Sequence, residues 1–167
     1  HGLVPNVITY SSVINACAKG NELQRALNLL DDMRSRGLVP DAITYSSVIH
    51  ACAKGGEWQR ALELLEVMRS RGLVPNEITY NSVINACAKG DEWQRALNLL
   101  DEMRRYGLVP DVITYSSVIH ACAMGGETQR ALYLLAGLRR CGSAPNEISY
   151  RSVIHACAKG GESQRAL

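Results

Sequence analysis

Hydrophobic side chains recur along this chain at the spacing of an amphipathic helix. Between residues 7 and 20, four of them fall at i, i+3, i+4 and i+7, which places them on one helix face. They are Tyr10, Val13, Ile14 and Cys17. Gly20 follows as a natural C-terminal stop. The pattern predicts a first helix, called helix A below.

A second apolar stripe of the same kind follows at once. Its members are Leu23, Ala26, Leu27, Leu30 and Met33. Gly37 ends the stripe, and Pro40 prevents its continuation because proline lacks the backbone N–H that a helix needs. This pattern predicts a second helix, helix B.

The two-helix pattern repeats every 35 residues. All five prolines share this spacing, at Pro5, Pro40, Pro75, Pro110 and Pro145. Four complete repeats cover residues 7–41, 42–76, 77–111 and 112–146, residues 147–167 begin a fifth, and residues 1–6 match the end of a unit. A fixed period of this length indicates a solenoid. We therefore predict a single all-α array over residues 1–167, a right-handed α-solenoid of antiparallel helix pairs with helix A on the concave side. Positions 1 to 35 below count from the first residue of a repeat.

Position 35 of each repeat is Asp or Asn, at Asp41, Asn76, Asp111 and Asn146. Each is placed to cap the next helix A, because its side-chain oxygen can accept a free backbone N–H. No run of about 18 apolar residues is present, so we expect no membrane span. The first residues carry no charged and apolar signal segment. Both ends read as a window cut from a longer array.

The cysteines and histidines are predicted to be structural. Position 11 holds Cys17, Cys52, Cys87, Cys122 and Cys157 on the apolar face, where a free thiol packs as a small hydrophobe. We expect neighbouring repeats to lie roughly 10 Å apart, which is too far for a disulfide. Cys141 is assigned no role. His50, His120 and His155 share position 9 with Asn15 and Asn85, which favours a polar surface position over a metal site. We expect no metal, no cofactor and no catalytic activity.

A polar stripe is predicted on helix A opposite the packing face. In the first repeat its members are Ile8, Ser11, Ser12, Asn15 and Lys19. Stacked repeats would align these stripes into a groove. The five helix A segments carry five basic and two acidic residues, a net charge of +3, whereas the remainder of the chain carries −1. A mildly positive inner face suits a polyanion, although an ordinary solvated face would look the same.

The run ITYSSVINACAKG, followed by ALNLLDDMRSRGLVPD with a period of 35, resembles the pentatricopeptide repeat of the pure 35-residue type. The resemblance covers essentially the whole chain, and the W…LG…Y signature of the 34-residue tetratricopeptide repeat is missing from it. It implies an α-solenoid that binds single-stranded RNA in mitochondria or chloroplasts. It further implies about one nucleotide per repeat, with the N-terminal repeats toward the RNA 5′ end.

The resemblance also assigns roles to residues. The base-reading pair of the family, positions 5 and 35, corresponds to Ser11 with Asp41, Ser46 with Asn76, Asn81 with Asp111, and Ser116 with Asn146. The base-packing position 2 corresponds to Ile8, Ile43, Ile78, Ile113 and Ile148. The phosphate-contacting lysine corresponds to Lys19, Lys54, Lys89 and Lys159, with Met124 in the fourth repeat. By the family's pairing rule the four repeats prefer 5′-GAUA-3′. Arg151 lacks a partner, so the fifth repeat is assigned no base.

Two purely structural interpretations compete with base reading at these positions: capping alone for position 35, and close helix packing for position 5. A different function is also open, that of a protein-binding scaffold in a large organellar assembly. Trp58 and Trp93, at the start of helix B, are candidate contacts for such a partner, with core packing as the alternative.

Overall fold

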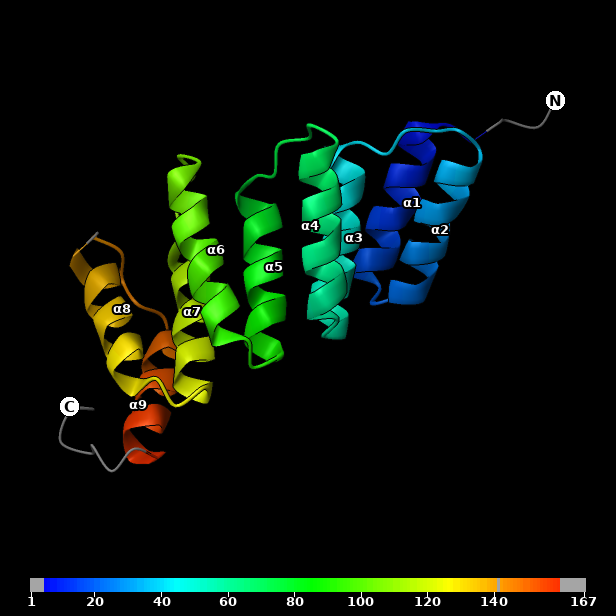
Figure 1. The fold of residues 1–167 in the computed structure, drawn as a ribbon. Coiled ribbons are helices and arrows are strands. Elements are labelled where there is room, and N and C mark those ends of the chain that lie inside the picture. The colour runs from blue at the N-terminus through cyan, green and yellow to red at the C-terminus, as the bar shows by residue number, and fades with distance from the viewer. Residues whose placement is uncertain (1–4, 141, 160–167) are drawn as a thin grey trace. The chain divides into compact units, whose positions relative to one another are not determined.

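The computed structural model describes residues 5–140 and 142–159, and all regular secondary structure within these ranges is α-helical (Figure 1). The helix A segments are α1 (Val7–Lys19), α3 (Ala42–Gly55), α5 (Glu77–Lys89), α7 (Val112–Met124) and α9 (Glu147–Lys159). The helix B segments are α2 (Leu23–Ser35), α4 (Trp58–Ser70), α6 (Trp93–Arg105) and α8 (Thr128–Arg140). The predicted all-α succession of helix pairs is confirmed.

The described residues form two compact units, one up to Ala86 and one from Cys87 onward. In the first unit, α1 packs against α2 and α3, and α3 packs against α4. In the second unit, α7 packs against α6, α8 and α9. In each unit a helix A therefore contacts both the helix B of its own repeat and the helix A of the next, as in a solenoid.

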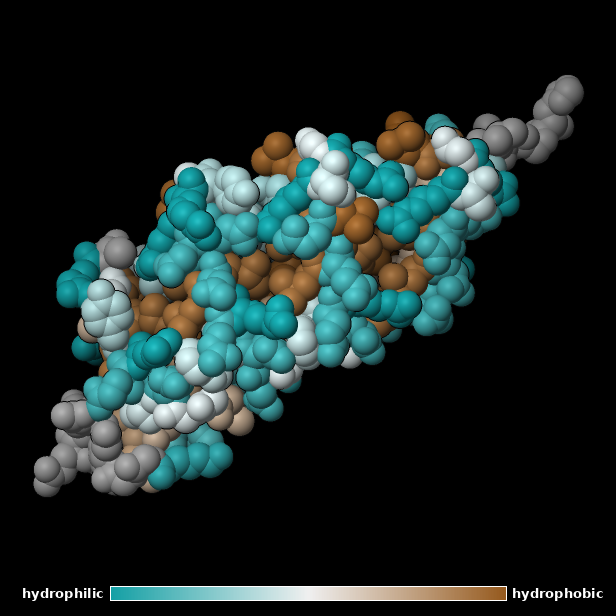
Figure 2. Space-filling view, viewed as in Figure 1, coloured by the Kyte–Doolittle hydropathy of each residue, from teal (hydrophilic) through white to brown (hydrophobic). Residues whose placement is uncertain are grey.

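The predicted apolar faces make the core. In the second repeat, the side chains of Tyr45, Val48, Ile49 and Cys52 are fully buried. Val13 differs, with 37% of its surface exposed, because no described helix packs against that side of α1. Figure 2 shows hydrophilic side chains over most of one face, with hydrophobic side chains visible between neighbouring helices.

An arginine from each helix B holds a tyrosine of the next helix A. The guanidinium of Arg34 donates to the Tyr45 hydroxyl at 3.0 Å and lies 5.6 Å from the centre of its ring. The same link joins Arg69 to Tyr80, Arg104 to Tyr115 and Arg139 to Tyr150. A hydrogen bond and a cation–π contact thus fix each repeat to the next across the proline-containing connection.

The predicted caps are present at the start of each helix A. The side-chain oxygen of Asp41 accepts the backbone N–H of Thr44 at 2.8 Å, and that of Asn76 accepts the backbone N–H of Thr79 at 3.0 Å. The same bond is made by Asn6, Asp111 and Asn146. Such a cap stabilises a helix by about 1 kcal/mol. Capping is therefore one function of position 35.

All five position-11 cysteines are free thiols and buried, as packing residues should be. Burial raises the pKa of the Cys52, Cys87 and Cys122 thiols to about 11, because a thiolate loses its hydration in an apolar surrounding. Cys141 lies outside the described residues. Among the helices that the structure describes, none combines the length and apolar character needed to cross a bilayer.

Candidate nucleic-acid interface

Position 2 of every repeat presents an exposed isoleucine on the first turn of helix A. The exposed fraction is 75% at Ile8, 66% at Ile43 and Ile78, 62% at Ile113 and 47% at Ile148. A large apolar side chain held in water at the same place in each repeat has no packing role in the helix pair. It offers a surface on which a flat apolar ligand can lie.

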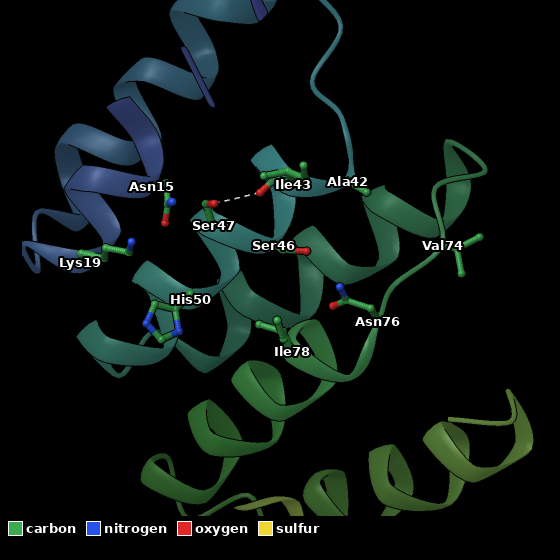
Figure 3. A pocket seen from close by; sticks show the side chains of 10 residues that line it. All are labelled: Asn15, Lys19, Ala42, Ile43, Ser46, Ser47, His50, Val74, Asn76 and Ile78. Carbon is green, nitrogen blue, oxygen red and sulfur yellow. Dashed lines mark hydrogen bonds between the residues drawn. The ribbon is translucent and has the colours of Figure 1, made fainter. Parts of the chain in front are cut away.

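A pocket of about 370 Å³ lies between two of these isoleucines in the first unit. Ile43 and Ile78 line it from successive helix A segments, and Ser46 and Asn76 lie between them (Figure 3). Its other lining residues are Asn15, Lys19, Ala42, Ser47, His50 and Val74. The structure therefore brings together the position-2, position-5 and position-35 residues that the sequence assigned to the second repeat.

The two polar residues of this pocket are joined through a third. Ser46 Oγ lies 2.7 Å from Thr79 Oγ1, and Thr79 Oγ1 donates to Asn76 Oδ1 at 3.0 Å. Thr79 is position 3 of the following repeat and is fully buried. Asn76 and Ser46 thus occupy fixed positions, whereas the amide nitrogen of Asn76 stands on the side away from Thr79.

The first repeat shows the same arrangement. Ser11 Oγ lies 2.7 Å from Thr44 Oγ1, which donates to Asp41 Oδ1 at 2.7 Å. Ser11 also donates to the Val7 carbonyl at 2.8 Å. The predicted pair of Ser11 and Asp41 is therefore connected through Thr44.

In the fourth repeat the pair is in direct contact. Ser116 Oγ lies 2.9 Å from Asn146 Oδ1, 2.8 Å from Ser149 Oγ and 2.6 Å from the Val112 carbonyl, and its one hydrogen is available to one of these acceptors. Ser149 Oγ donates to the same Asn146 oxygen at 2.9 Å. In the third pair, Asn81 belongs to the first unit and Asp111 to the second. Asn81 is half-buried, and Asp111 is exposed and closes a capping box with Thr114.

The expectation that the whole polar stripe lies opposite the packing face is wrong at position 5. Ser11 is only 9% exposed and Ser116 only 3%, whereas Ser12, Asn15 and Lys19 are exposed. The physical reason is that position 5 lies at the seam between adjacent helix A segments, where its hydroxyl bonds to the next repeat. Close packing and pocket lining therefore coexist at Ser46, the most open of the three serines.

The predicted phosphate-contacting lysines Lys19, Lys54, Lys89 and Lys159 are all exposed. Lys54 Nζ donates to the backbone carbonyl of Lys19 at 3.0 Å, so its ammonium group lies over the C-terminal end of α1. An ammonium group carries three donors, which leaves Lys54 able to bind a further acceptor. Met124 holds this slot in α7 and is 44% exposed.

Position 9 contributes to the same pocket in the first two repeats. Asn15 and His50 line the Ser46 pocket, and His50 Nδ1 is 3.4 Å from Ser82 Oγ. His120 Nδ1 is 3.1 Å from Ser152 Oγ, and burial together with the nearby Arg151 lowers the His120 pKa. Within residues 5–140 and 142–159, no group of three or more His, Cys, Asp or Glu side chains is placed to hold a metal ion.

Sequence reasoning missed the position-3 residues Thr44 and Thr79 as members of the site. A signal was available, because position 3 is a hydroxyl residue in every repeat: Thr9, Thr44, Thr79, Thr114 and Ser149. Threonine is a poor helix former, so its recurrence at one helical position indicates a role for the hydroxyl.

Comparison with known proteins agrees with this geometry. The sequence family described as the pentacotripeptide-repeat region of PRORP matches residues 6–167. The crystal structure of the pentatricopeptide repeat protein PPR10 from maize is 32% identical over 99% of the chain, with a TM-score of 0.72. The chain spans 24% of the length of that protein. The search of curated proteins gave no match.

Two further structures share the fold. PPR10 in complex with an 18-nt psaJ RNA element has a TM-score of 0.79 at 26% identity, covering 99% of this chain and 25% of that one. The PPR domain of Arabidopsis thaliana protein-only RNase P 1, in complex with tRNA, has a TM-score of 0.80 at 17% identity, covering 93% of this chain and 82% of that one. Because the family match extends over nearly all of the 35-residue helix pairs described above, the chain belongs to the pentatricopeptide repeat family.

Proposed function

We propose that this chain binds single-stranded RNA, with about one base per repeat, the N-terminal repeats toward the RNA 5′ end, and a preferred core of 5′-GAUA-3′. The observation that carries the proposal is the pocket of about 370 Å³ between Ile43 and Ile78, with Ser46 and Asn76 between them. Its apolar walls suit the faces of a base, and its polar residues suit the edge by which an unstacked base is read.

The charges around the pocket support a polyanionic ligand. Lys19 lines the pocket, and Lys54 follows one repeat later on the same side of helix A. Phosphate groups along an RNA backbone would meet one lysine per repeat, except at Met124. The RNA complexes of maize PPR10 and of the protein-only RNase P 1 domain support the same ligand class by family.

The test is selection from a randomised RNA pool by the chain, followed by sequencing of the bound molecules. We expect enrichment of 5′-GAUA-3′ over its single-base variants. Recovery of an unenriched pool at low salt would overturn the base assignments and leave only non-specific binding. We assign binding and no catalysis to these residues, and place the parent protein in mitochondrial or chloroplast RNA processing by family resemblance.

A second candidate function, a protein-binding scaffold, is favoured by one observation. A pocket of about 340 Å³ in the second unit is lined by Trp93, Tyr133 and Arg130, among others. The Arg130 guanidinium lies 4.9 Å from the centre of the Trp93 ring, and Tyr133 is 69% exposed. This function would be favoured if the chain captured a protein partner, if the Tyr133→Ala variant failed to capture it, and if no RNA were enriched.

A further inference from the structure

We propose that the position-3 hydroxyl of each following repeat sets the hydrogen-bonding character of the base pocket before it. Thr79 makes Ser46 an acceptor and turns the amide nitrogen of Asn76 into the pocket, so that the second pocket takes a base edge with a donor beside an acceptor. This inference rests on the proposed RNA binding. It assigns a positioning role to a buried residue that does not itself touch the base.

The first step concerns the hydrogen atom of Thr79. A hydroxyl group has one hydrogen to donate. Thr79 Oγ1 donates it to Asn76 Oδ1 at 3.0 Å, so it cannot also donate to Ser46. The contact of 2.7 Å between Ser46 Oγ and Thr79 Oγ1 must then be a bond that Ser46 donates. Only the lone pairs of Ser46 are left for a ligand, and Ser46 is an obligate acceptor.

The second step concerns the orientation of the Asn76 amide. The backbone N–H of Thr79 can only donate, and it lies 3.0 Å from the side-chain oxygen of Asn76. The oxygen is held by this bond and by the Thr79 hydroxyl, so the NH₂ group must point the other way. Asn76 therefore presents donors to the pocket, next to the acceptor of Ser46.

An acceptor beside a donor selects among the bases. Adenine carries its amino group next to the acceptor N1, so both of its edge groups find partners. Guanine held in the same orientation reverses both groups: its O6 acceptor would face the Ser46 oxygen and its N1–H donor would face the Asn76 NH₂ group. An unpaired donor in a partly desolvated site costs more than the lost bond alone. Cytosine has the same donor–acceptor order as adenine, so it differs from adenine by ring size and not by edge chemistry.

The first repeat applies the same rule with a different result. Thr44 Oγ1 donates to Asp41 at 2.7 Å, so the Ser11 hydrogen goes to Thr44 or to the Val7 carbonyl and is not left for a ligand. Asp41 has a second carboxylate oxygen, which can only accept. Ser11 and Asp41 therefore offer two acceptors, and guanine presents two adjacent donors. One network gives opposite preferences because position 35 changes from Asp to Asn.

The test compares Thr79→Val with Thr79→Ser, measured by fluorescence anisotropy with short RNAs that contain 5′-GAUA-3′, 5′-GGUA-3′ or 5′-GCUA-3′. Valine keeps the shape of threonine and removes the hydroxyl, so the Ser46 hydrogen is released and the pocket loses its defined acceptor. We expect the ratio of adenine to guanine affinity at the second RNA position to fall roughly tenfold in Thr79→Val, as for loss of a bidentate base contact. Thr79→Ser should keep the ratio.

Thr44→Val is the matched control within the chain. It makes the same change one repeat earlier, so it should lower the guanine preference at the first RNA position and leave the second unchanged. Thermal unfolding of each variant checks that it is folded. If Thr79→Val does not fold, Ser46→Ala replaces it in the test, because this substitution removes the acceptor from a half-buried site. We expect the ratio of adenine to guanine affinity at the second RNA position to fall in Ser46→Ala as well.

The possible results distinguish a failure of this inference from a failure of the proposed RNA binding. If the unmodified chain prefers adenine at the second position and Thr79→Val prefers it equally, the inference is overturned and the RNA binding stands. If Thr79→Val weakens all three RNAs alike, Thr79 has only a structural role and the inference is again overturned. If the unmodified chain shows no preference, the proposed base assignments fail, and the inference fails with them.

Discussion

Ser116 Oγ lies 2.9 Å from the side-chain oxygen of Asn146, and also 2.6 Å from the Val112 carbonyl, whereas in the second repeat Thr79 joins Ser46 to Asn76. The sequence gives both repeats the same pair of Ser and Asn. They differ at position 3 of the next repeat, where Ser149 lacks the methyl group of threonine. Ser116 is also more buried, at 3% exposure.

This difference predicts unequal adenine sites in one chain. The lone pairs of Ser116 are less accessible than those of Ser46, so we expect a weaker adenine preference at the fourth RNA position than at the second. Ser149→Thr should strengthen the fourth. The enrichment of adenine at both positions in one randomised pool measures the effect. Equal enrichment at the two positions in the unmodified chain would contradict the prediction.

Asn76→Asp is expected to move the second position from adenine toward guanine. The exchange replaces an NH₂ donor in the pocket by a carboxylate acceptor and keeps the oxygen that caps α5 through Thr79. Discrimination should change by about 1 to 3 kcal/mol, the usual range for a bidentate base contact. Asn6→Asp is the control, since it makes the same exchange at the cap of α1, outside the four pairs. An unchanged preference in Asn76→Asp would falsify the base assignment.

The fold was predictable from the sequence because periodicity, glycines and prolines act locally. Gly20 caps α1, and Asp41 caps α3, at the residues that the pattern indicated. The seam between repeats was not predictable in the same way. Whether Ser11 faces solvent or Thr44 depends on the rotation of one helix A relative to the next. The apolar periodicity of a single helix does not determine this rotation.

The salt dependence of RNA binding is expected to reveal the phosphate contacts made by the lysines. With three of them as phosphate contacts, log affinity against log salt should have a slope of roughly −2, and Lys54→Ala should flatten it by about 0.7. Sequence preference should change little. Arg25→Ala is the matched control, because it removes the same charge from α2, where Arg25 pairs with Glu22. A slope that is the same in Lys54→Ala and the unmodified chain would show that Lys54 only caps the Lys19 carbonyl.

The arginine–tyrosine links are expected to couple neighbouring repeats. Tyr45→Phe removes the hydroxyl that accepts from Arg34 and leaves the ring in place. We expect the free energy of unfolding in urea to fall by about 1.5 to 3 kcal/mol, as for a bond to a charged group. Tyr133→Phe, at an exposed ring, should change it by less than about 0.5 kcal/mol. Equal effects of the two substitutions would exclude a special contribution from the link.

The buried cysteines are expected to lower stability at high pH. Their folded-state pKa of about 11 lies above the unfolded value, so the folded chain holds the thiol protons more tightly. This contribution is complete below the unfolded pKa of about 8.5 and is lost as the pH rises toward about 11. Urea unfolding between about pH 8 and pH 10.5 should show the fall. A variant with alanine at Cys52, Cys87 and Cys122 should show a smaller one; an identical fall would assign it to other groups.

The hydroxyl of Thr79 has a consequence for exchanging repeats between proteins of this family. The boundary that the prolines suggest separates Asn76 from Thr79, and so divides one pocket between two building blocks. A block that starts at Tyr45 and ends at Thr79 has the same length of 35 residues and carries Ser46, Asn76 and their connecting threonine together. Chimaeras joined after position 3 should therefore transfer a base preference intact. In those joined after position 35, the position-3 residue of the pocket comes from the neighbouring repeat.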